Sequence, residues 1–554
     1  MIPQIPISLD RQGYFVRGEE RIIPVGASYW PASCGFQMWR EWPETEIKQD
    51  LDYLVSLSMN TVRFFLRWED FEPAPEQYSA IMFDRLTMFL DWCQTRGLFA
   101  QVVIFTPVAH ATQTGPAWKG DRNFYSDPFM LQRSLEFARK VAATCAPYAV
   151  GMLGFDIGHN LSKLPDCDSA SPATIRKWSK DIASALRAVC TSALVTCGNG
   201  IDQITKDTGW RLGEIGGCQY QTMHGSNWPS DHCVNIDGMM DAFSHSLIPF
   251  YTEIARSFGP VMLQDISIRP SIGGKQPEAF LRSILNASWD AGANGFLWCL
   301  LRDIPTIGPA STHHPINGNI GLLDETGAVK PGLQYFVDFA HTVAELGRPR
   351  ISTNFVGIYL PKHFYPRDNP ENCSNTPVDV IRSAVMANYH LRKIGYETHI
   401  VRGDKPINPR LRTIFVTGAN LRPDEAVALT EWVESGGRLI WHGPDPLNWG
   451  PEYCKLLGAR PVDYRAATEV IVPFNGLEWK FDSFPRNLRV QVDSLTCNFL
   501  ASDDRGVPVV LRNSLGTGAV ICALPKIDES AAAITHLPLS RDRCTTWYEG
   551  MLRA

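Results

Sequence analysis

Side chains with acid–base and hydrogen-bonding chemistry follow short apolar segments of the chain. Asp156, His159 and Asn160 lie in the run GFDIGHNLS, and Asp265 lies near the end of the run PVMLQDIS. A carboxylate can act as a base or a nucleophile and an imidazole can transfer a proton, whereas an Asn amide only makes hydrogen bonds. We take these four as the candidate catalytic residues, assembled from the ends of separate strands.

Other segment ends carry aromatic and polar side chains. Aromatic faces stack on pyranose rings and polar groups fix the hydroxyls, so this mixture suits a sugar. A structural alternative exists for Asp156, which could simply neutralise a neighbouring arginine, because buried carboxylates are usually paired. The expected substrate-binding residues are Arg63, Tyr29, Trp30, His224, Trp228, Trp298 and Asp303.

The segments that position these residues repeat a strand–helix rhythm over the first 345 residues or so. Eight such units predict a (β/α)₈ TIM barrel, whose active site lies at the carboxyl ends of its strands. A doubly wound sheet usually carries a phosphate loop, and no GxGxxG or GxxxxGK[ST] run follows a strand here. The strands we expect are Ile22–Ser28, Thr61–Leu66, Ala100–Phe105, Gly151–Ile157, Ala193–Cys197, Gly217–Met223, Pro260–Ile266 and Gly295–Leu300.

The rest of the chain divides in two by its pattern. Strands and helices alternate again after the barrel, in a flavodoxin-like α/β order, and short alternating strands with a hairpin near Gly516–Gly518 follow. The α/β segment has no phosphate loop and no nucleophile elbow, which favours a structural or assembly role. We therefore predict an α/β protein with a barrel over 1–347, a flavodoxin-like domain over 348–458 and a small β-rich domain over 459–554.

Composition excludes several classes of protein. Of the 554 residues, 44% are hydrophobic and 20% charged, as in a globular protein, and the net charge of −6 gives no attraction to nucleic acid or anionic membranes. No apolar run approaches the roughly 20 residues that span a bilayer. The first residues lack the features of a signal peptide, and the 14 cysteines are scattered. We expect a cytoplasmic protein that contacts neither nucleic acid nor membrane.

The barrel segments resemble the clan A glycoside hydrolases, close to the cellulase-like family 5 and to the family 42 β-galactosidases that carry a trimerisation domain. The runs GASYWP and NTVRFFLRWEDFEP are similar to the first two units of these barrels, and IGLLDETGAVKPGL is similar to the segment that closes them. His224 matches the strand-6 His of the clan, and Trp298 resembles its strand-8 Trp. The resemblance covers about 450 residues. It implies a β-linked carbohydrate substrate and a homo-oligomer, a trimer or a dimer.

Both usual catalytic glutamates of the clan are replaced in this alignment. Strand 4 of the clan ends in Asn-Glu, where the Glu is the acid/base, but here the pair reads His159-Asn160. The strand-7 nucleophile, a second Glu, falls on Asp265. Retaining hydrolysis needs two carboxyl groups about 5–5.5 Å apart. Asn160 cannot transfer a proton, and Asp265 is one methylene shorter than Glu, which sets its carboxylate back by an amount that can cost about 10²-fold in rate.

Three interpretations remain open from the sequence. In the first, Asp265 acts as base to a water and His159 or Asp156 supplies the proton, as in an inverting arrangement with its wider carboxyl separation. In the second, the barrel no longer hydrolyses and only binds a sugar. In the third, the alignment is displaced and Asp156 is the working carboxylate.

We therefore expect a glycosidase acting on a β-linked glycoside or short oligosaccharide through a non-standard carboxylate arrangement. The alternative is a non-catalytic carbohydrate-binding or scaffold protein on a degenerate barrel. Neither a cofactor nor a metal is expected, because the adjacent His313 and His314 supply only two ligands.

Overall fold

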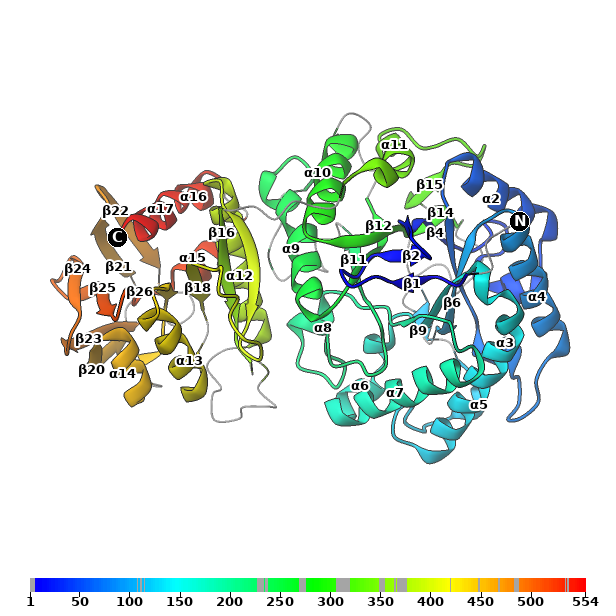
Figure 1. Cartoon of the computed structure of the whole chain (residues 1–554), viewed down its shortest axis with the longest axis horizontal. Coiled ribbons are helices and arrows are strands. Elements are labelled where there is room, and N and C mark those ends of the chain that lie inside the picture. The colour runs from blue at the N-terminus through cyan, green and yellow to red at the C-terminus, as the bar shows by residue number, and fades with distance from the viewer. Residues whose placement is uncertain are drawn as a thin grey trace. The chain divides into compact units, whose positions relative to one another are not determined.

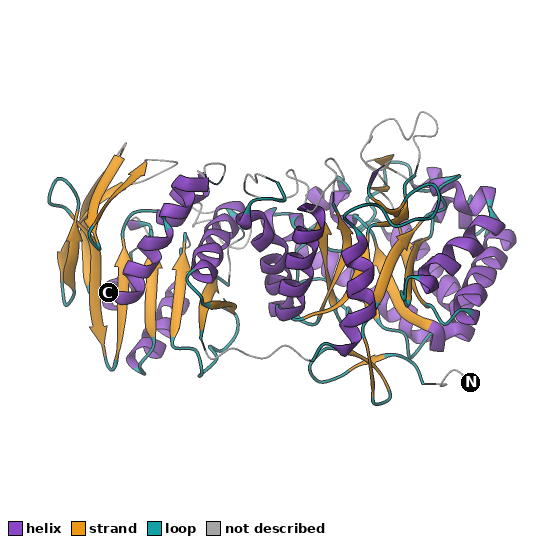
Figure 2. Cartoon of the chain, turned by 90° about the horizontal axis from the view of Figure 1, so that it is seen from above, coloured by secondary structure: helices purple, strands orange, loops and turns teal. Residues whose placement is uncertain are grey.

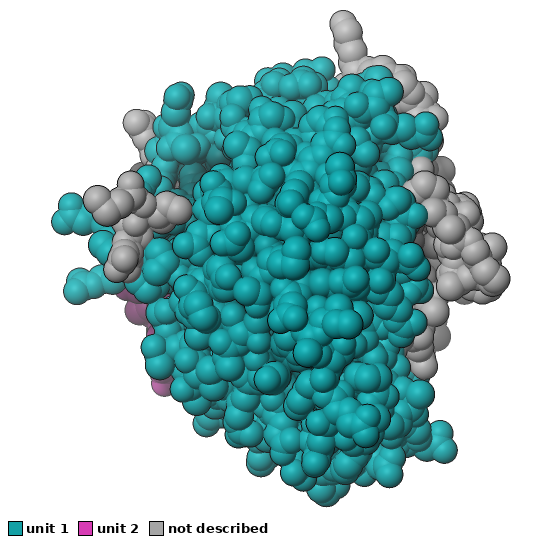
Figure 3. Space-filling view, turned by 90° about the vertical axis from the view of Figure 1, so that its right-hand side faces the viewer, with its two compact units in different colours: residues 1–203, 208–231, 251–349 teal, residues 204–207, 232–250, 350–554 magenta. Residues whose placement is uncertain are grey.

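The computed structural model divides the chain into two compact units. Unit 1 comprises residues 1–203, 208–231 and 251–349, and unit 2 comprises residues 204–207, 232–250 and 350–554 (Figure 3 shows one face of unit 1 in teal). The structure describes residues 5–106, 108–109, 112–113, 115–226, 234, 238–268, 276–304, 319–347, 354–362, 365, 376–418, 420–446, 449–466, 469–482, 488–533, 535 and 538–554.

Unit 1 contains an eight-stranded parallel barrel, which confirms the predicted fold class. The strand order is β10-β9-β6-β5-β4-β13-β12-β11. Backbone bonds also join the two outermost strands, since the Gln219 amide donates to the Val195 carbonyl (2.9 Å) and the His224 amide to the Asn199 carbonyl (3.1 Å). The strands are β4 (Val25–Tyr29), β5 (Thr61–Phe65), β6 (Phe99–Phe105), β9 (Met152–Gly158), β10 (Val195–Thr196), β11 (Gln221–Ser226), β12 (Val261–Ser267) and β13 (Ala293–Trp298).

All eight predicted strands exist, and the sixth differs most from its expected bounds. The sequence predicts Gly217–Met223, whereas β11 begins at Gln221 and continues to Ser226. Gly217 has a φ of +83°, outside the β region, so the extended backbone starts only after it. The displacement brings His224 inside the strand rather than just beyond it.

Helices separate the barrel strands along the chain and surround them in space (Figures 1 and 2). Several begin with Pro in the first turn after an Asp or Ser cap, as at Asp127 and Ser171, whose side chains accept from backbone amides of that turn. The helices are α1 (Met38–Glu41), α2 (Glu44–Ser56), α3 (Trp68–Phe71), α4 (Ala80–Thr95), α5 (Pro128–Cys145), α6 (Asp166–Ser169), α7 (Pro172–Val189), α8 (Asp202–Thr205), α9 (Ala242–Phe258), α10 (Gln276–Asp290) and α11 (Gln334–Thr342).

An apolar cluster lies at the amino ends of the barrel strands. The antiparallel strands β1 (Ser8–Leu9), β2 (Phe15–Arg17) and β3 (Glu20–Ile22) precede the barrel in the chain. Phe15 of β2 meets Tyr220 edge to face, with 5.1 Å between ring centroids. The cluster fills this end of the barrel mainly with apolar side chains. Its buried members are Ile7, Phe15, Ile22, Phe99, Leu153, Tyr220, Met262 and Leu297.

Unit 2 is built on a seven-stranded sheet in the order β17-β16-β18-β19-β26-β25-β24. Its first five strands are parallel in the flavodoxin-like order 2-1-3-4-5. Four of them lie in the segment expected to be flavodoxin-like, whereas the fifth, β26, comes from the segment expected to form a separate β-rich domain. The expected hairpin is present and pairs with β19, so these late strands extend the same sheet. The strands are β16 (Phe355–Leu360), β17 (Glu397–Arg402), β18 (Thr413–Thr417), β19 (Arg438–His442), β24 (Asn498–Ser502), β25 (Pro508–Leu515) and β26 (Gly518–Ala523).

Six helices and two further strand pairs lie in the described part of residues 350–554 of unit 2. The antiparallel pairs are β20 (Ala459–Ala466) with β23 (Leu488–Ser494), and β21 (Glu469–Phe474) with β22 (Leu477–Asp482). The helices are α12 (Pro377–Lys393), α13 (Pro423–Glu434), α14 (Pro451–Leu457), α15 (Ile527–Ala533), α16 (Pro538–Arg543) and α17 (Thr545–Arg553). No helix of the described residues is long and apolar enough to cross a membrane.

Candidate active site

A buried arginine links two carboxylates at the carboxyl ends of the barrel strands. Arg63 of β5 donates to Asp156 of β9 through Nε (3.1 Å) and Nη2 (2.9 Å). Its Nη1 donates to Oδ1 of Asp265 on β12, at 3.2 Å. The structure thus brings together three residues that are far apart in the chain and that the sequence singled out.

Backbone amides fix Asp156 in place on its other side. Its Oδ1 accepts from the amide of Gly158 at 3.1 Å and from the amide of Gly198 at 3.0 Å. A side chain at Gly198 would lie 3.5 Å from Nη2 of Arg63 and 3.0 Å from the Gly158 carbonyl, so glycine permits this close approach. Asp156 is fully buried and bonded on both oxygens. The pairing with Arg63 that the sequence raised as its structural alternative is therefore present.

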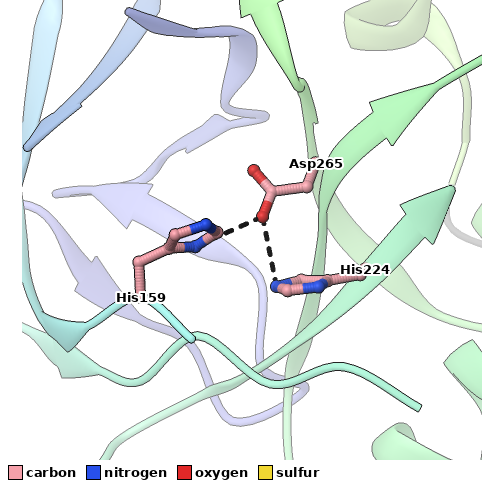
Figure 4. Close-up of side chains that lie close together, drawn as sticks. All are labelled: His159, His224 and Asp265. Atoms are coloured by element: carbon pink, nitrogen blue, oxygen red, sulfur yellow. Dashed lines mark ion pairs between the residues drawn. The ribbon is translucent and has the colours of Figure 1, made fainter. Parts of the chain in front are cut away.

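Two histidines face the carboxylate of Asp265 (Figure 4). Nε2 of His224, on β11, lies 3.1 Å from Oδ2, and Nδ1 of His159 lies 3.5 Å from the same oxygen. Asp265 has a φ of +51°, a left-handed conformation that costs energy for a non-glycine residue. Such strain persists only where the surroundings enforce it, and here the surroundings are the charged cluster itself.

The cluster sets the protonation of its members. Burial alone would raise the pKa of Asp265, but the Arg63 guanidinium, followed by the two histidines, brings that pKa below its ordinary value. Burial, the largest effect, lowers the pKa of both His159 and His224 in spite of the Asp265 charge. At neutral pH the site therefore holds an ionised carboxylate beside two neutral imidazoles.

Asn160 and Ser28 complete the cluster. Nδ2 of Asn160 lies 2.8 Å from Nε2 of His159, and the Asn160 backbone is left-handed at φ +55°. The Ser28 hydroxyl, on β4, donates to Asp265 at 3.4 Å and accepts from Arg63 at 3.3 Å. The sequence analysis did not select Ser28. The sequence feature that could have identified Ser28 is a polar side chain in an otherwise apolar strand. In the structure Ser28 is in register with Arg63 on the next strand.

Three expected sugar contacts lie away from this cluster. The hydroxyl of fully buried Tyr29 donates to Asp50 of α2 at 3.1 Å. Trp298 has no exposed surface, and its Nε1 donates to the Ile320 carbonyl at 2.8 Å. Its ring meets Phe336 of α11, so it faces the helices.

Asp303 contacts Gly321 and Lys330, which follow it in the chain. Its Oδ1 accepts from the Gly321 amide at 2.7 Å, and its Oδ2 pairs with Nζ of Lys330 at 2.5 Å. These bonds occupy both carboxylate oxygens and tie the chain after β14 (Leu300–Arg302) to β15 (Gly321–Leu323).

The ring of Phe65 lies between Trp30 and His159. Trp30 stacks on Phe65 with 5.4 Å between centroids, and Phe65 in turn meets the His159 ring at 5.3 Å. Phe65 also lies under the Arg63 guanidinium at 4.7 Å, yet the sequence offered no sign of this role beyond its place at a strand end. Trp228, and the loop histidines 313 and 314, lie outside the described residues.

Comparison with solved structures identifies the family. The exo-β-1,4-mannosidase of Opitutaceae bacterium strain TAV5 is 38% identical, with 98% of this chain and 99% of that chain covered and a TM-score of 0.94. The chain belongs to the clan A glycoside hydrolases. No protein-family model and no curated protein sequence matches it.

More distant structures share the fold of this clan A glycoside hydrolase. A GH5_18 variant from Streptomyces cattleya, in complex with Manb1-4GlcNAc, is 17% identical over 71% of this chain and 99% of its own, with a TM-score of 0.62. A β-galactosidase from Rahnella sp. R3 is 12% identical over 94% of this chain and 88% of its own, with a TM-score of 0.72. The latter extends the likeness beyond the barrel into the C-terminal sheet.

Proposed function

We propose that the protein hydrolyses a β-linked glycoside, with Asp265 as the essential carboxylate. The observation that carries this proposal is the carboxylate of Asp265, whose Oδ1 lies 3.2 Å from Nη1 of Arg63 at the end of β12 in a clan A barrel. Against the effect of burial, the Arg63 guanidinium and the two histidines lower the pKa of Asp265 and so favour its charged form. A glycosidase transition state resembles an oxocarbenium ion, and a buried anion at this position stabilises its positive charge. β-1,4-linked mannosides are the first substrates to test, because the relative with 38% identity over nearly the whole chain is an exo-β-1,4-mannosidase.

The proposed mechanism differs from the usual one of the clan, in which two glutamates are the catalytic residues. Asp265 acts as the base that takes a proton from water while that water attacks the anomeric carbon, and the shorter side chain leaves room for the water. Asp156 is a poor proton donor to substrate, since Arg63 and two backbone amides occupy its oxygens. His159 is better placed, beside Asp265 and partly exposed. As a neutral imidazole it donates a hydrogen bond to the departing oxygen, which leaves as an anion and takes its proton from solvent, so activated leaving groups are assisted most.

A second candidate function is non-catalytic binding of the same class of sugar. The observation in its favour is the amide of Asn160, which lies next to His159 and cannot supply a proton. The two candidates predict the same ligands but opposite results in a turnover assay.

The test is a panel of aryl glycosides, α and β, with β-mannosides included. Turnover of a β-glycoside that falls by at least about 10³-fold in Asp265→Asn, with unchanged circular dichroism, supports the proposal. Undiminished turnover in Asp265→Asn contradicts the role of Asp265. No turnover of any glycoside in the panel by the wild-type protein, together with sugar-induced thermal stabilisation, supports the binding function instead.

Asp265→Glu is the matched variant, since it retains the charge. Its carboxylate advances by about 1 Å or more into the histidines, and a misplacement of that size costs about 10²-fold in rate. We therefore expect lower turnover than in the wild type. A gain would indicate that the pocket retains the geometry of a retaining enzyme.

A further inference from the structure

Two polar atoms of the cluster are buried without a hydrogen bond. Among the described residues, neither Nε2 of His224 nor Oδ2 of Asp265 has a hydrogen-bond partner, although the two atoms lie only 3.1 Å apart. The other oxygen of Asp265 is held by Arg63 and Ser28. Buried polar atoms in proteins are nearly always paired, so both atoms point to a group that binds between them.

The geometry of the cluster fits a metal ion. His159, His224 and Asp265 each offer one ligand atom, and these three atoms all lie within 4.8 Å of one another (Figure 4). In a tetrahedral site with metal–ligand bonds near 2.1 Å, neighbouring ligand atoms lie about 3.4 Å apart. The separations from Oδ2, 3.1 Å to His224 and 3.5 Å to His159, are close to this value, and the separation between the two ligating nitrogens is no more than 4.8 Å.

We propose that His159, His224 and Asp265 form a binding site for a divalent transition-metal ion such as Zn²⁺. Two imidazoles and one carboxylate are a ligand set that suits zinc, copper, nickel and iron, whereas magnesium and calcium prefer oxygen alone. Three protein ligands leave a fourth position for water. Each histidine side chain is 17% exposed, which gives an ion a path to the cluster.

The neighbours of His159 orient it as a ligand. The side-chain amide of Asn160 holds the ring from its other side, with Nδ2 2.8 Å from Nε2. A neighbouring residue that fixes the ring of a ligating histidine is usual at metal sites.

Arg63 places a positive charge beside the cluster. Its Nη2 lies 3.3 Å from Nδ1 of His159, and this contact is lost when the metal takes Nδ1. Two hydrogen bonds to Asp156 hold the guanidinium independently of that contact.

Metal and glycoside compete for the cluster. This consequence rests on the proposed function, because Oδ2 of Asp265 would coordinate the ion and is also the free oxygen available to act as a base. Zinc should therefore inhibit turnover competitively. The ion would act as a regulator of this site by occupying it.

Calorimetric titration of the chelator-treated protein with Zn²⁺ tests the site without substrate. We expect one ion per chain in the wild type and binding at least about 100-fold weaker in His224→Asn, since even the loss of a supporting residue costs 10–100-fold. His341→Asn, on the exposed surface of α11, is the matched control and should bind as the wild type does. Equal binding by all three proteins, or no saturable binding by the wild type, overturns the site.

Two further measurements guard against misfolding and separate the proposals. Circular dichroism establishes that His224→Asn is folded, and Co²⁺ in place of Zn²⁺ should give visible absorption in the wild type that Asp265→Asn lacks. Turnover that is unchanged at saturating Zn²⁺ overturns the competition and leaves the metal site standing. Absence of turnover under all conditions overturns the proposed function, whereas the metal site is still decided by the Zn²⁺ titration.

Discussion

Arg63 and Asp156 form an ion pair with no exposed surface on either side chain, at 2.9 Å between Nη2 and Oδ2. The two residues lie 93 positions apart in the sequence, on barrel strands β5 and β9. Because Arg63 also reaches Asp265, one guanidinium serves two carboxylates. The same pair therefore supports both the fold of the barrel and the charge of the candidate catalytic residue.

Arg63→Met should destabilise unit 1 by about 3–5 kcal/mol, because removing one partner leaves a buried charge without compensation. Urea unfolding followed by tryptophan fluorescence measures the change. Arg96→Met is the matched control. Nε of Arg96 lies 2.6 Å from Asp52, whose side chain is 64% exposed, so this ion pair is in contact with solvent. Such surface pairs contribute about 0–1 kcal/mol. Similar losses in the two variants would contradict the structural role of Arg63.

Asp50 should make stability depend on pH. Burial, opposed by Arg302 and Tyr29, raises the pKa of Asp50 from 3.8 to about 7. A carboxyl whose folded-state pKa is raised contributes stability below its unfolded pKa and loses it as the pH rises through the folded value. The melting temperature of the wild type should fall between pH 5 and pH 8 more steeply than that of Asp50→Asn.

Asp52→Asn is the control for this titration. It lies on the same helix, and the Arg96 hydrogen bond lowers the pKa of Asp52, so it does not titrate in that window. Parallel melting curves for the wild type and Asp50→Asn over this range would refute the assignment.

Trp298 should act on stability rather than on sugar binding. Trp298→Ala removes a fully buried ring packed against Phe336 and is expected to cost about 3–5 kcal/mol. Trp298→Phe keeps a ring but loses the hydrogen bond to Ile320, so its loss should be smaller. Thermal unfolding and the KM for the preferred glycoside are measured side by side. A raised KM at unchanged stability would restore Trp298 as a sugar contact.

The sequence by itself determined the order of strands and helices and which strand ends carry polar groups. Arg63, Asp156, His159, His224 and Asp265 could be selected because polar residues interrupt long apolar runs at those points. Parallel strands meet at their carboxyl ends, so the barrel rhythm alone predicted that these side chains share one end of the fold.

Only the tertiary structure decided which way the neighbouring side chains face. Barrel strands are buried on both faces, so their sequences lack the polar–apolar alternation that would reveal orientation. Tyr29 and Trp298 turn to the helices, while Ser28, the residue before Tyr29, faces Asp265. Contacts such as the one between His224 and Asp265 depend on separations of a few ångströms across the barrel, which the spacing of residues along a chain does not encode.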